Sequence, residues 1–418
     1  MLDIKFIRDN VKKVEETAAL KRCTMDLAAL FTLDDERKKV LTDVEEKKSV
    51  RNTANQEITR LKKKGDDFKT KIDEMKTLSQ KIKEADAQLA GIESRIRDIM
   101  ITIPNIAHKD VPPGKDEKAN KFIREWGEER LFAFEPKDHL EIAEASGMLD
   151  MKRAGKITGS GFGLYCGKGA MLERALINFM IDFHIKKHGY KEILPPFLVN
   201  EDSMFGTGQL PKLKEDMYNL EEDGLYLIPT AEVPVTNMHR DEILNEKDLP
   251  IKYVSYTPCF RREAGSYGKD TRGISRVHQF NKVEMVKFTT PETSYEEHES
   301  LLKDAEDILQ ALGLRYRVML LSAGDMSFAA AKCYDIEVWA PGSQRWLEVS
   351  SCSNFEDFQA RRADIRYRPK DGGKTQFVHT LNASGVALPR TFIGIVEQYQ
   401  DEEGSIRIPE VLHQYCRQ

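Results

Sequence analysis

Residues 257–289 contain the side chains best suited to binding a nucleotide. The sequence predicts two β-strands joined by a basic, glycine-rich loop, and side chains alternate between the two faces of a strand. Arg261 and Glu263 should therefore share a face of the first strand. Guanidinium groups bind phosphate oxygens, an aromatic ring stacks on a base, and carboxylates bind an amine or Mg²⁺. The set would suit a nucleoside triphosphate, although a salt-bridged hairpin on a charged surface would also explain it. One face of the second strand should carry Arg276, His278, Phe280, Lys282 and Glu284.

Arg390 is a second candidate for binding an anion. Pro389 and the apolar residues after Arg390 predict a helix that begins here, because proline is favoured in the first turn. A cation in the first turn lies at the positive end of the helix dipole, where it is disfavoured unless an anion is bound beside it. Arg390 is therefore expected either to bind an anion or to point into solvent.

Glu348 is a candidate for a paired or metal-bearing carboxylate. It follows Trp346 and Leu347 in an apolar run, and strand alternation would place Glu348 and Ser350 on one face. Carboxylates rarely lie in such surroundings unless they are paired or hold a cation. A buried salt bridge would be an alternative explanation for this residue.

The composition of the 418-residue chain indicates a globular protein of two or three domains. Hydrophobic residues make up 40% of the chain, and no run approaches the roughly 18 apolar residues of a membrane span. Asp3 and Asp9 argue against a signal or transit peptide, so we expect a cytoplasmic protein that makes no membrane contact. The six cysteines lack CxxC spacing, which predicts neither a zinc site nor a disulfide framework. Because the net charge is only −5, any RNA-binding surface must be local.

A heptad pattern predicts that residues 35–100 form a long antiparallel helical hairpin that projects as an arm. Positions 40, 44, 47, 51, 54, 58 and 61 keep a rhythm of four and three residues, and Lys64, Gly65 and Asp66 predict a break. Two apolar series then recur every seven residues: Met75, Ile82, Leu89 and Ile96, and Leu78, Ala85, Ile92 and Ile99.

The flanks and the end of this predicted arm are rich in lysine and arginine. Such charges either pair with neighbouring Glu and Asp on a solvated face or contact the phosphates of RNA. The basic residues are Lys47, Lys48, Arg51, Arg60, Lys62, Lys63, Lys64, Lys69, Lys71 and Lys76.

The remainder of the chain predicts an α+β body. Residues 1–103 would form an N-terminal domain, residues 104–121 a proline-rich linker and residues 122–418 the main domain. Pro195 and Pro196 should confine a strand to an edge or a break after an amphipathic helix at Met171–Lys187. An antiparallel β-sheet with helices packed against one side is expected from strands at 225–229, 254–263, 277–289, 333–340 and 345–353.

Four motifs, in order along the chain, resemble those of the seryl-tRNA synthetases, a family of class II aminoacyl-tRNA synthetases. Thr230–Pro234 (TAEVP) resembles the serine-binding loop of that family, and the FRRE segment that ends at Glu263, with Arg276, Phe280 and Glu284 of the following strand, resembles its motif 2. Glu348–Arg362 resembles its ATP and Mg²⁺ strand, and Thr380–Thr391 its motif 3. The similarity runs from the first residues to near the end of the chain. It implies a class II catalytic domain preceded by an N-terminal coiled-coil arm.

The resemblance implies which residues bind ATP and Mg²⁺. Arg261 would contact the α-phosphate, Arg276 the outer phosphates and Arg390 the γ-phosphate, so these three are the expected catalytic residues. Glu348 and Ser351 would hold Mg²⁺. The full ATP set would be Arg261, Arg262, Glu263, Arg276, Val277, Phe280, Glu348, Val349, Ser350, Ser351 and Arg390.

The resemblance also implies a serine pocket. A pocket whose polar groups only a substrate hydroxyl can satisfy would reject alanine. One carboxylate would bind the α-ammonium group and another the hydroxyl group, and the sequence leaves open which does which. The serine set would be Thr230, Ala231, Glu232, Arg261, Glu284, Asn382 and Ser384.

The chain departs from the common form of motif 3 at two positions. Ala383 precedes the serine contact and Pro389 precedes the arginine, where family members commonly have glycine. Neither side chain is large or charged, so the departures bear on the conformation of the loop and leave its chemistry in place.

The implied activity is ATP-dependent activation of L-serine to seryl-adenylate, followed by transfer to the 3′ end of tRNA(Ser). The coiled-coil arm would bind this tRNA, tRNA(Sec) would be a further substrate where the host has one, and the protein would be a homodimer. A paralogue that charges a carrier protein is one alternative, although it should lack the arm. A non-catalytic coiled-coil RNA-binding protein is another.

Overall fold

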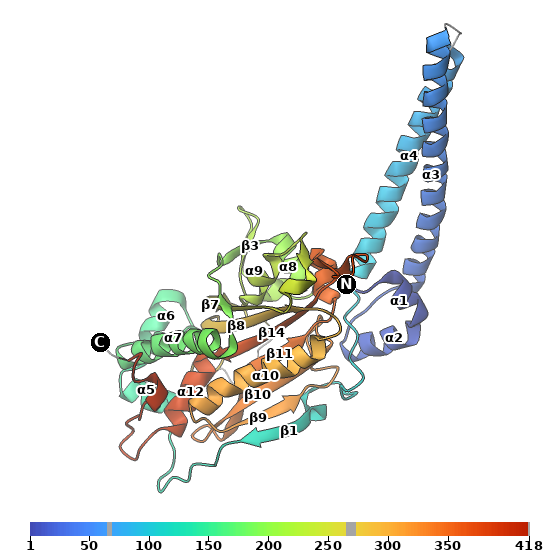
Figure 1. The fold of residues 1–418 in the computed structure, drawn as a ribbon. Coiled ribbons are helices and arrows are strands. Elements are labelled where there is room, and N and C mark those ends of the chain that lie inside the picture. The colour runs from blue at the N-terminus through green and yellow to red at the C-terminus, as the bar shows by residue number, and fades with distance from the viewer. Residues whose placement is uncertain (65–68, 265–272, 417–418) are drawn as a thin grey trace. The chain divides into compact units, whose positions relative to one another are not determined.

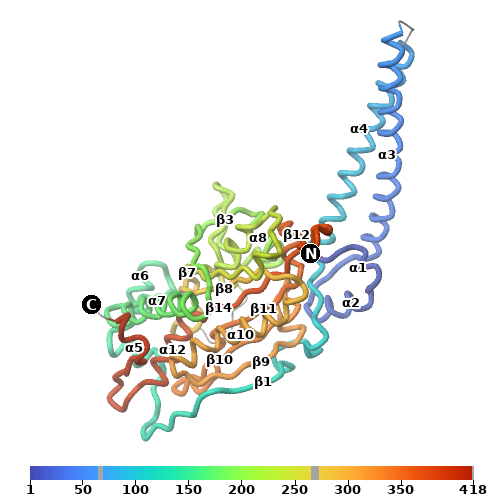
Figure 2. Tube along the Cα trace, in the orientation of Figure 1, coloured from blue at the N-terminus to red at the C-terminus, as the bar shows by residue number. Residues whose placement is uncertain are grey.

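The computed structural model describes residues 1–64, 69–264 and 273–416 (Figures 1 and 2). The chain divides into two compact units. The first, which we call the helical unit, comprises residues 2–19 and 23–104, and the second, the sheet unit, comprises residue 1, residues 20–22 and residues 105–418. The predicted helix break at Gly65 and Asp66 lies outside the described residues. Across the described ranges, no helix is both long and apolar enough to cross a membrane.

The helical unit confirms the predicted helical hairpin. Helices α3 (Leu27–Lys64) and α4 (Lys69–Met100) run side by side, after the short helices α1 (Ile4–Asp9) and α2 (Val11–Leu20) (Figures 1 and 2). Every position of the predicted heptad series in both helices is buried or half-buried, whereas most residues between them are exposed. A seven-residue apolar repeat therefore forms the contact between the two helices.

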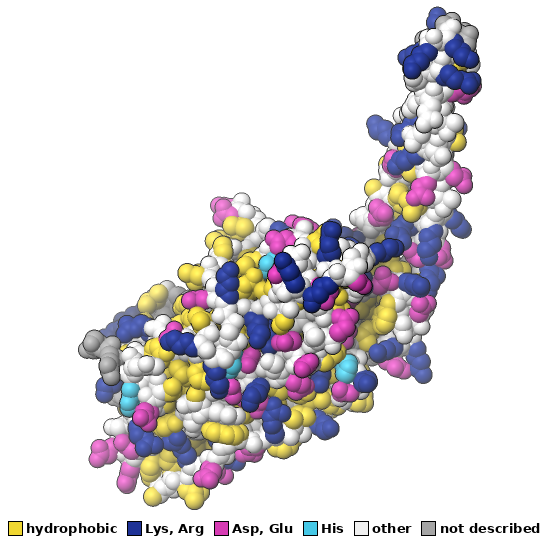
Figure 3. Space-filling view, in the orientation of Figure 1, with side chains coloured by type: hydrophobic (Ala, Val, Ile, Leu, Met, Phe, Trp, Pro, Cys, Tyr) yellow, Lys and Arg dark blue, Asp and Glu magenta, His cyan; other side chains and the backbone are white. Residues whose placement is uncertain are grey.

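Several basic residues of the arm form ion pairs. Lys48 pairs with Asp86 of the opposite helix at 2.9 Å, and Lys71 pairs with Glu57 across the same seam. Lys47 and Lys76 pair with aspartates on their own helices. The lysines in the last turn of α3 are exposed, and Figure 3 shows Lys and Arg side chains gathered at this end of the arm. These exposed lysines are Lys62, Lys63 and Lys64.

The sheet unit is built on an eight-stranded sheet, as the α+β interpretation predicted. The order is β1-β9-β10-β11-β14-β8-β7-β2, and all neighbours are antiparallel except β2 and β7. The short β2 lies at the edge, just before Pro195 and Pro196, as the two prolines predict. The strands span β1 Lys121–Trp126, β2 Lys191–Glu192, β7 Ile251–Phe260, β8 Gln279–Thr289, β9 Tyr316–Leu320, β10 Lys332–Ala340, β11 Arg345–Asn354 and β14 His379–Ala387.

Helices α7 (Lys168–His188), α10 (Ser294–Ala311) and α12 (Leu388–Gln398) cover one face of this sheet (Figure 1). Val283 and Met285 of β8 point toward them and are fully buried in the main core. Because side chains alternate, Lys282 and Glu284 must lie on the opposite face. One face of the sheet thus builds the core, and the other is free to form a site.

Smaller elements complete the sheet unit. Two three-stranded sheets have the orders β13-β12-β6 and β3-β5-β4. They comprise β3 Leu198–Asn200, β4 Asn219–Leu220, β5 Leu225–Leu227, β6 Ile243–Asn245, β12 Arg366–Arg368 and β13 Gln376–Phe377. The remaining helices are α5 His139–Ala145, α6 Met151–Thr158, α8 Glu201–Thr207, α9 Glu232–Asn237 and α11 Phe358–Ala363, with single 3-10 turns at Glu117–Ala119, Lys214–Asp216, Glu246–Asp248 and Glu410–Leu412.

The sequence placed the first strand of the central hairpin too far along the chain. Strand β7 ends at Phe260, so Arg261 and Glu263 follow the strand. After Arg261 the chain turns toward the 3-10 turn at Lys214–Asp216, because the amide of Arg262 donates to the carbonyl oxygen of Asp216 at 2.9 Å. Glu263 takes a positive φ of 51°, which a strand residue does not adopt.

Candidate active site

A cavity of about 460 Å³ lies on the face of the sheet opposite α7, α10 and α12. Its walls come from the hairpin β7–β8, strands β11 and β14, the start of α12 and the segment around Thr230. Most of the predicted site residues meet here although they are far apart in sequence. The predicted residues that line it are Thr230, Glu232, Arg261, Glu263, Arg276, Val277, Phe280, Glu284, Glu348, Val349, Ser351, Asn382, Ser384 and Arg390.

The inner part of the cavity is a buried polar network that we call the inner cluster: Thr230, Glu232, Lys282, Glu284, Gln359 and Asn382. Each of these residues is at most 8% exposed. Lys282 lies at the centre, where its Nζ donates to Thr230 Oγ1 at 2.9 Å and pairs with Glu284 Oε2 at 2.5 Å. Asn382 Nδ2 donates to the other oxygen of Glu284 at 3.1 Å. Buried charges of this kind persist only when they are paired, so the cluster holds its side chains in fixed positions.

Glu232 is the member of the inner cluster whose acidity is most altered. Its pKa is raised to about 7, because burial and the nearby Glu284 carboxylate raise it more than Gln359, Lys282 and Arg261 lower it. Gln359 Nε2 donates to Glu232 Oε1 at 2.6 Å and is itself fixed by Thr380. A bound cation, such as an ammonium group, would reduce the electrostatic repulsion between the Glu232 and Glu284 carboxylates.

The outer part of the cavity carries two arginine–glutamate pairs that we call the outer cluster: Glu263, Arg276, Glu348 and Arg390. Arg276 pairs with Glu263, and Arg390 Nη1 lies 3.4 Å from Glu348 Oε2. The side chains of the two arginines are 28% and 24% exposed. Arg390 also donates from Nε to the Ser275 carbonyl oxygen at 3.1 Å. Both guanidinium groups are thus accessible from the cavity, and an anion could share or replace their carboxylate partners.

Arg261 lies between the two clusters. Its Nε donates to the carbonyl oxygen of Pro229, next to Thr230, at 3.3 Å. Its guanidinium carbon lies 5.2 Å from the centre of the Phe280 ring, a distance typical of cation–π contacts. Phe280 is half-buried against the main core and lines the cavity. Arg261 therefore lines the cavity beside Phe280 and next to the inner cluster.

A β-bulge at Val349 corrects the predicted faces of strand β11. Ile336 pairs with Ser350 and Glu337 pairs with Glu348, so Val349 has no partner in the register. The extra residue turns Glu348 and Ser351 toward the cavity, and Ser350 instead donates its hydroxyl group to the carbonyl oxygen of Ser384. Alternation alone had paired Glu348 with Ser350, which is wrong for this reason.

The residues around Ser351 include oxygen donors that would suit a magnesium ion. Asp335 lies directly opposite Ser351 in the register, and burial and the nearby Glu348 carboxylate hold the pKa of Asp335 well above its ordinary value. No cluster of three or more His, Cys, Asp or Glu side chains with ligand geometry occurs within the described ranges. Carboxylate and hydroxyl oxygens beside bound phosphates are nevertheless the donor set that Mg²⁺ prefers, because this ion usually takes one or two carboxylates.

Three predicted residues are not among the described residues that line the cavity: Ala231, Arg262 and Ser350. His278 also differs from its predicted place on the shared face of β8. Strand β8 begins at Gln279, so alternation does not extend back to His278, whose ring packs 5.2 Å from that of Phe162. Arg276 and Val277 also precede the strand, yet both line the cavity.

Gln359 and Asp335 are site residues that the sequence did not single out. Gln359 is fully buried and joins Glu232 to Thr380, and Asp335 lies beside Ser351. The only sequence signal would have been a polar residue in an apolar helix or strand. Strand alternation predicted the correct face of β8 for Lys282, but the predicted serine set did not include this residue.

The departures in motif 3 fit the fold. Ala383 is fully buried and pairs with Met285 of β8 and Cys352 of β11. Pro389 lies in the first turn of α12, where its missing amide hydrogen costs nothing. Neither departure displaces Arg390 or Ser384 from the wall of the cavity.

Comparisons with known proteins agree with this geometry. Residues 1–107 match the seryl-tRNA synthetase N-terminal domain, and residues 216–399 match the tRNA synthetase class II core domain (G, H, P, S and T). A serine–tRNA ligase of Syntrophomonas wolfei is 55% identical over 99% of this chain and 97% of its own length.

Solved structures agree as well. Seryl-tRNA synthetase from Pyrococcus horikoshii, crystallised with ATP, has a TM-score of 0.90 and 38% identity, over 100% of this chain and 98% of that one. A cytoplasmic serine–tRNA ligase from Naegleria fowleri, crystallised with AMP, has a TM-score of 0.85 and 30% identity, over 100% and 97% of the two chains. The chain belongs to the seryl-tRNA synthetase family of class II aminoacyl-tRNA synthetases.

Proposed function

We propose that the cavity of the sheet unit activates L-serine with ATP and then transfers the seryl group to tRNA(Ser). The observation that carries this proposal is the division of one cavity into a buried inner cluster and an accessible outer cluster, joined by Arg261. A small zwitterion suits the first cluster and a polyphosphate suits the second. Their reacting atoms, the carboxylate and the α-phosphate, would meet beside Arg261.

Serine recognition is assigned to the inner cluster. Glu232 and Glu284 would accept hydrogen bonds from the α-ammonium and hydroxyl groups of serine, within a frame held by Lys282, Asn382 and Thr230. Ser384, directly opposite Glu284 in the register, would complete the pocket. Alanine would leave a buried acceptor without a donor, which costs several kcal/mol in discrimination.

ATP binding is assigned to the outer cluster and Phe280. The adenine ring would stack on Phe280, Arg261 would neutralise the α-phosphate, and Arg276 and Arg390 would bind the outer phosphates. Arg276 and Arg390 each already have a carboxylate partner, so their guanidinium groups are held in place before ATP arrives. Glu348 and Ser351 would hold Mg²⁺, which would supply charge neutralisation for the departing pyrophosphate.

Transfer to tRNA is assigned to the two units together. Residues 1–103 would form the tRNA-binding domain, with the exposed Lys62, Lys63 and Lys64 contacting the RNA backbone. Residues 104–121 would connect it to a catalytic domain at 122–418. The same enzyme would charge tRNA(Sec) where the host has one, and it would act in the cytoplasm.

A homodimer is proposed from the segment after α7. Leu194 is 73% exposed and Leu198 is 39% exposed, on either side of Pro195 and Pro196. Exposed apolar residues in such a short segment are typical of a surface that a partner covers. The homodimer implied by the resemblance to the seryl-tRNA synthetases supports a second copy of the chain as that partner.

ATP–pyrophosphate exchange without tRNA tests the activation step. The assay compares serine with threonine, alanine, glycine and cysteine, each at saturating ATP. Exchange that depends on serine is the expected result, with alanine and glycine reduced by about 10³ or more. Exchange with alanine or glycine would favour the paralogue that charges a carrier protein, and no exchange with any of them would favour a non-catalytic RNA-binding protein.

A further inference from the structure

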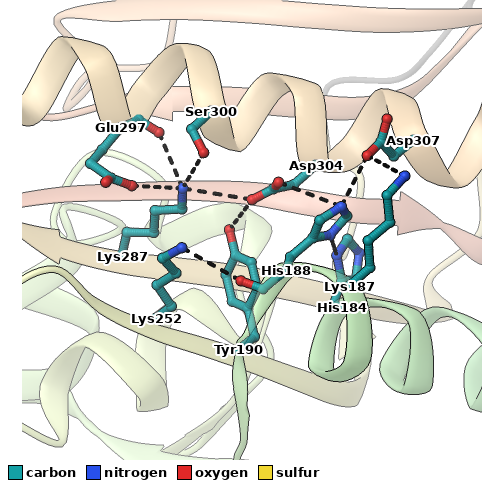
Figure 4. Close-up of polar contacts among 10 residues, drawn as sticks. All are labelled: His184, Lys187, His188, Tyr190, Lys252, Lys287, Glu297, Ser300, Asp304 and Asp307. Carbon is teal, nitrogen blue, oxygen red and sulfur yellow. Dashed lines mark hydrogen bonds and ion pairs between the residues drawn. The ribbon is translucent and has the colours of Figure 1, made fainter.

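A second buried polar network lies on the helix side of the sheet, behind the cavity (Figure 4). It joins the end of α7 to α10 and β8. Lys287 of β8 is fully buried, and its Nζ pairs with Glu297 at 2.9 Å and lies 3.6 Å from Asp304. The hydroxyl group of Tyr190 donates to the same Asp304 carboxylate at 2.7 Å. Strand β8, which carries Glu284 on its other face, is therefore tied to α10.

Two histidines of α7 extend this network toward β14. His188 Nε2 lies 3.1 Å from Asp307 Oδ2, and since a carboxylate accepts only, the imidazole must donate. His188 Nδ1 lies 3.0 Å from His184 Nδ1. Figure 4 shows the two imidazole rings one above the other. Lys187 also forms an ion pair with Asp307. The ring of His184 is fully buried, and burial lowers its pKa to about 3, so it is neutral.

The far side of the His184 ring meets the backbone of Gly385. A Cβ added at Gly385 would lie 3.0 Å from His184 Nε2 and 3.3 Å from Val283 Cγ1, so a larger residue would require these neighbours to shift by a few tenths of an ångström. The Gly385 backbone raises the pKa of His184 against the larger effect of burial, as an acceptor beside the ring would do. Within the described ranges, Nε2 makes no hydrogen bond of good geometry, which leaves this contact as its closest polar environment.

Gly385 lies where strand β14 departs from regular pairing. Ser384 pairs with Glu284, but the register to β8 then shifts before Ala387. The next residue, Val386, is fully buried with φ at 119°, a conformation that β-branched residues rarely adopt. Strained backbone of this kind persists only where its surroundings hold it. His184 lies against Gly385, the residue between Ser384 and Val386.

We infer that His184, held by His188 and Asp307, is a positioning residue for serine: it fixes the Gly385–Val386 bulge and thereby the placement of Ser384 opposite Glu284. This inference rests on the proposed function, because it deepens the assignment of the inner cluster to serine. His184 does not touch the substrate, since it lies on the opposite face of the sheet. Its loss should therefore weaken serine binding selectively and leave ATP binding intact.

Two substitutions of His184 test separately its contact to His188 through Nδ1 and its contact to Gly385 through Nε2. The amide of asparagine reaches about as far as Nδ1, so His184→Asn keeps the contact to His188 and loses the contact to Gly385. The longer glutamine reaches about as far as Nε2, so His184→Gln restores the contact to Gly385. In serine-dependent exchange, His184→Asn should raise KM for serine about 10-fold and leave KM for ATP within about 2-fold. His184→Gln should recover most of that loss.

His298→Asn is the matched control. His298 is also fully buried, and its Nε2 lies 2.9 Å from the Cys352 carbonyl oxygen of β11 instead of facing the Gly385 backbone. This variant should lose stability without any rise in KM for serine relative to ATP. If His184→Asn changed the two KM values in parallel, as a purely structural role predicts, or left KM for serine within about 2-fold of wild type, the inference would be overturned.

Gly385→Ala tests the same contact from the other side if His184→Asn does not fold. The added methyl group should press on His184 and Val283 and raise KM for serine selectively. Combining it with His184→Ala, which makes room for the methyl group, should give less than the product of the two single effects. Multiplicative effects would contradict the contact. If the wild-type enzyme showed no serine-dependent exchange, the proposed function would be overturned. If the wild type showed exchange but the variants did not behave as described, only the inference on His184 would be overturned.

Discussion

The inner and outer clusters of the cavity both contain ion pairs between a cation and a carboxylate, but these pairs differ in their exposure to solvent. Lys282 and Glu284 are 7% and 1% exposed at their side chains, whereas Arg390 and Glu348 are 24% and 47% exposed. A buried pair cannot separate without leaving a charge unsolvated, while a partly exposed pair can exchange its partner for water or a phosphate. The inner cluster is thus a rigid template that suits a small substrate needing strict discrimination. The outer cluster is a replaceable set of ion pairs that suits a polyphosphate that must bind and leave.

Arg261 joins the two clusters, and its loss should have the largest effect. In the proposed mechanism it neutralises charge that develops on the α-phosphate in the transition state, so Arg261→Ala should lower kcat for pyrophosphate exchange about 10³-fold. Arg262→Ala is the matched control, since Arg262 is not among the described residues lining the cavity. A kcat for Arg262→Ala within about 3-fold of wild type is expected. Equal losses from the two variants would contradict the role of Arg261.

The next largest predicted effect is a difference in the free energy of unfolding that is lost when an ion pair of each cluster is broken. Lys282→Met removes one partner of a buried pair and leaves Glu284 uncompensated, which should lower the free energy of unfolding by about 3 kcal/mol. Arg276→Ala breaks a partly exposed pair and should cost at most about 1 kcal/mol. Urea denaturation of both variants measures the difference. Similar midpoints would show that the two clusters do not differ in rigidity.

The pH dependence of serine activation should follow the ionisation of the Glu232 carboxyl group. Its pKa is raised to about 7, so the carboxylate is mainly protonated at pH 6 and mainly ionised at pH 8. An ionised carboxylate binds ammonium, so kcat/KM for serine should rise about 10-fold over this interval. Glu232→Gln should give a low and flat profile. A wild-type profile that falls with pH would contradict this assignment.

The same shift predicts an opposite effect on stability. A carboxyl group whose folded pKa is raised binds its proton more tightly in the folded state, so its contribution is favourable at low pH. That contribution is lost as pH rises from about 4.5 to 7. At pH 8, Glu232→Gln should therefore be more stable than wild type by on the order of 2 kcal/mol, although its activity should be low. Thermal unfolding at pH 5 and pH 8 tests this, because the gain should be absent at pH 5.

The smallest predicted effect concerns the geometry of the outer cluster. Arg390→Lys keeps the charge but loses the planar set of donors that now contacts Glu348 and Ser275. KM for ATP should rise about 5-fold, while KM for serine stays unchanged. Steady-state exchange at varied ATP measures this. An unchanged KM for ATP would indicate that Arg390 acts as a point charge alone.

Strand alternation predicted the site well where pairing is regular and failed where it is not. Phe280 and Glu284 of β8 face the cavity as predicted, because β8 pairs with β7 in unbroken register. The bulge at Val349 arises from pairing with β10 and has no signature in the local sequence. The partner of Gln359 is likewise distant, since Glu232 lies in another helix. The heptad repeat needed only local periodicity, so the helical hairpin could be predicted almost residue by residue.

Comparing KM for serine and KM for ATP in Lys282→Met and Arg276→Ala tests the central claim most directly. Both values come from pyrophosphate exchange under one set of conditions, with wild type measured alongside. We predict that Lys282→Met raises KM for serine at least about 10-fold and leaves KM for ATP within about 2-fold, and that Arg276→Ala does the reverse. If either variant raised both values together, the division of the cavity into a serine half and an ATP half would be contradicted.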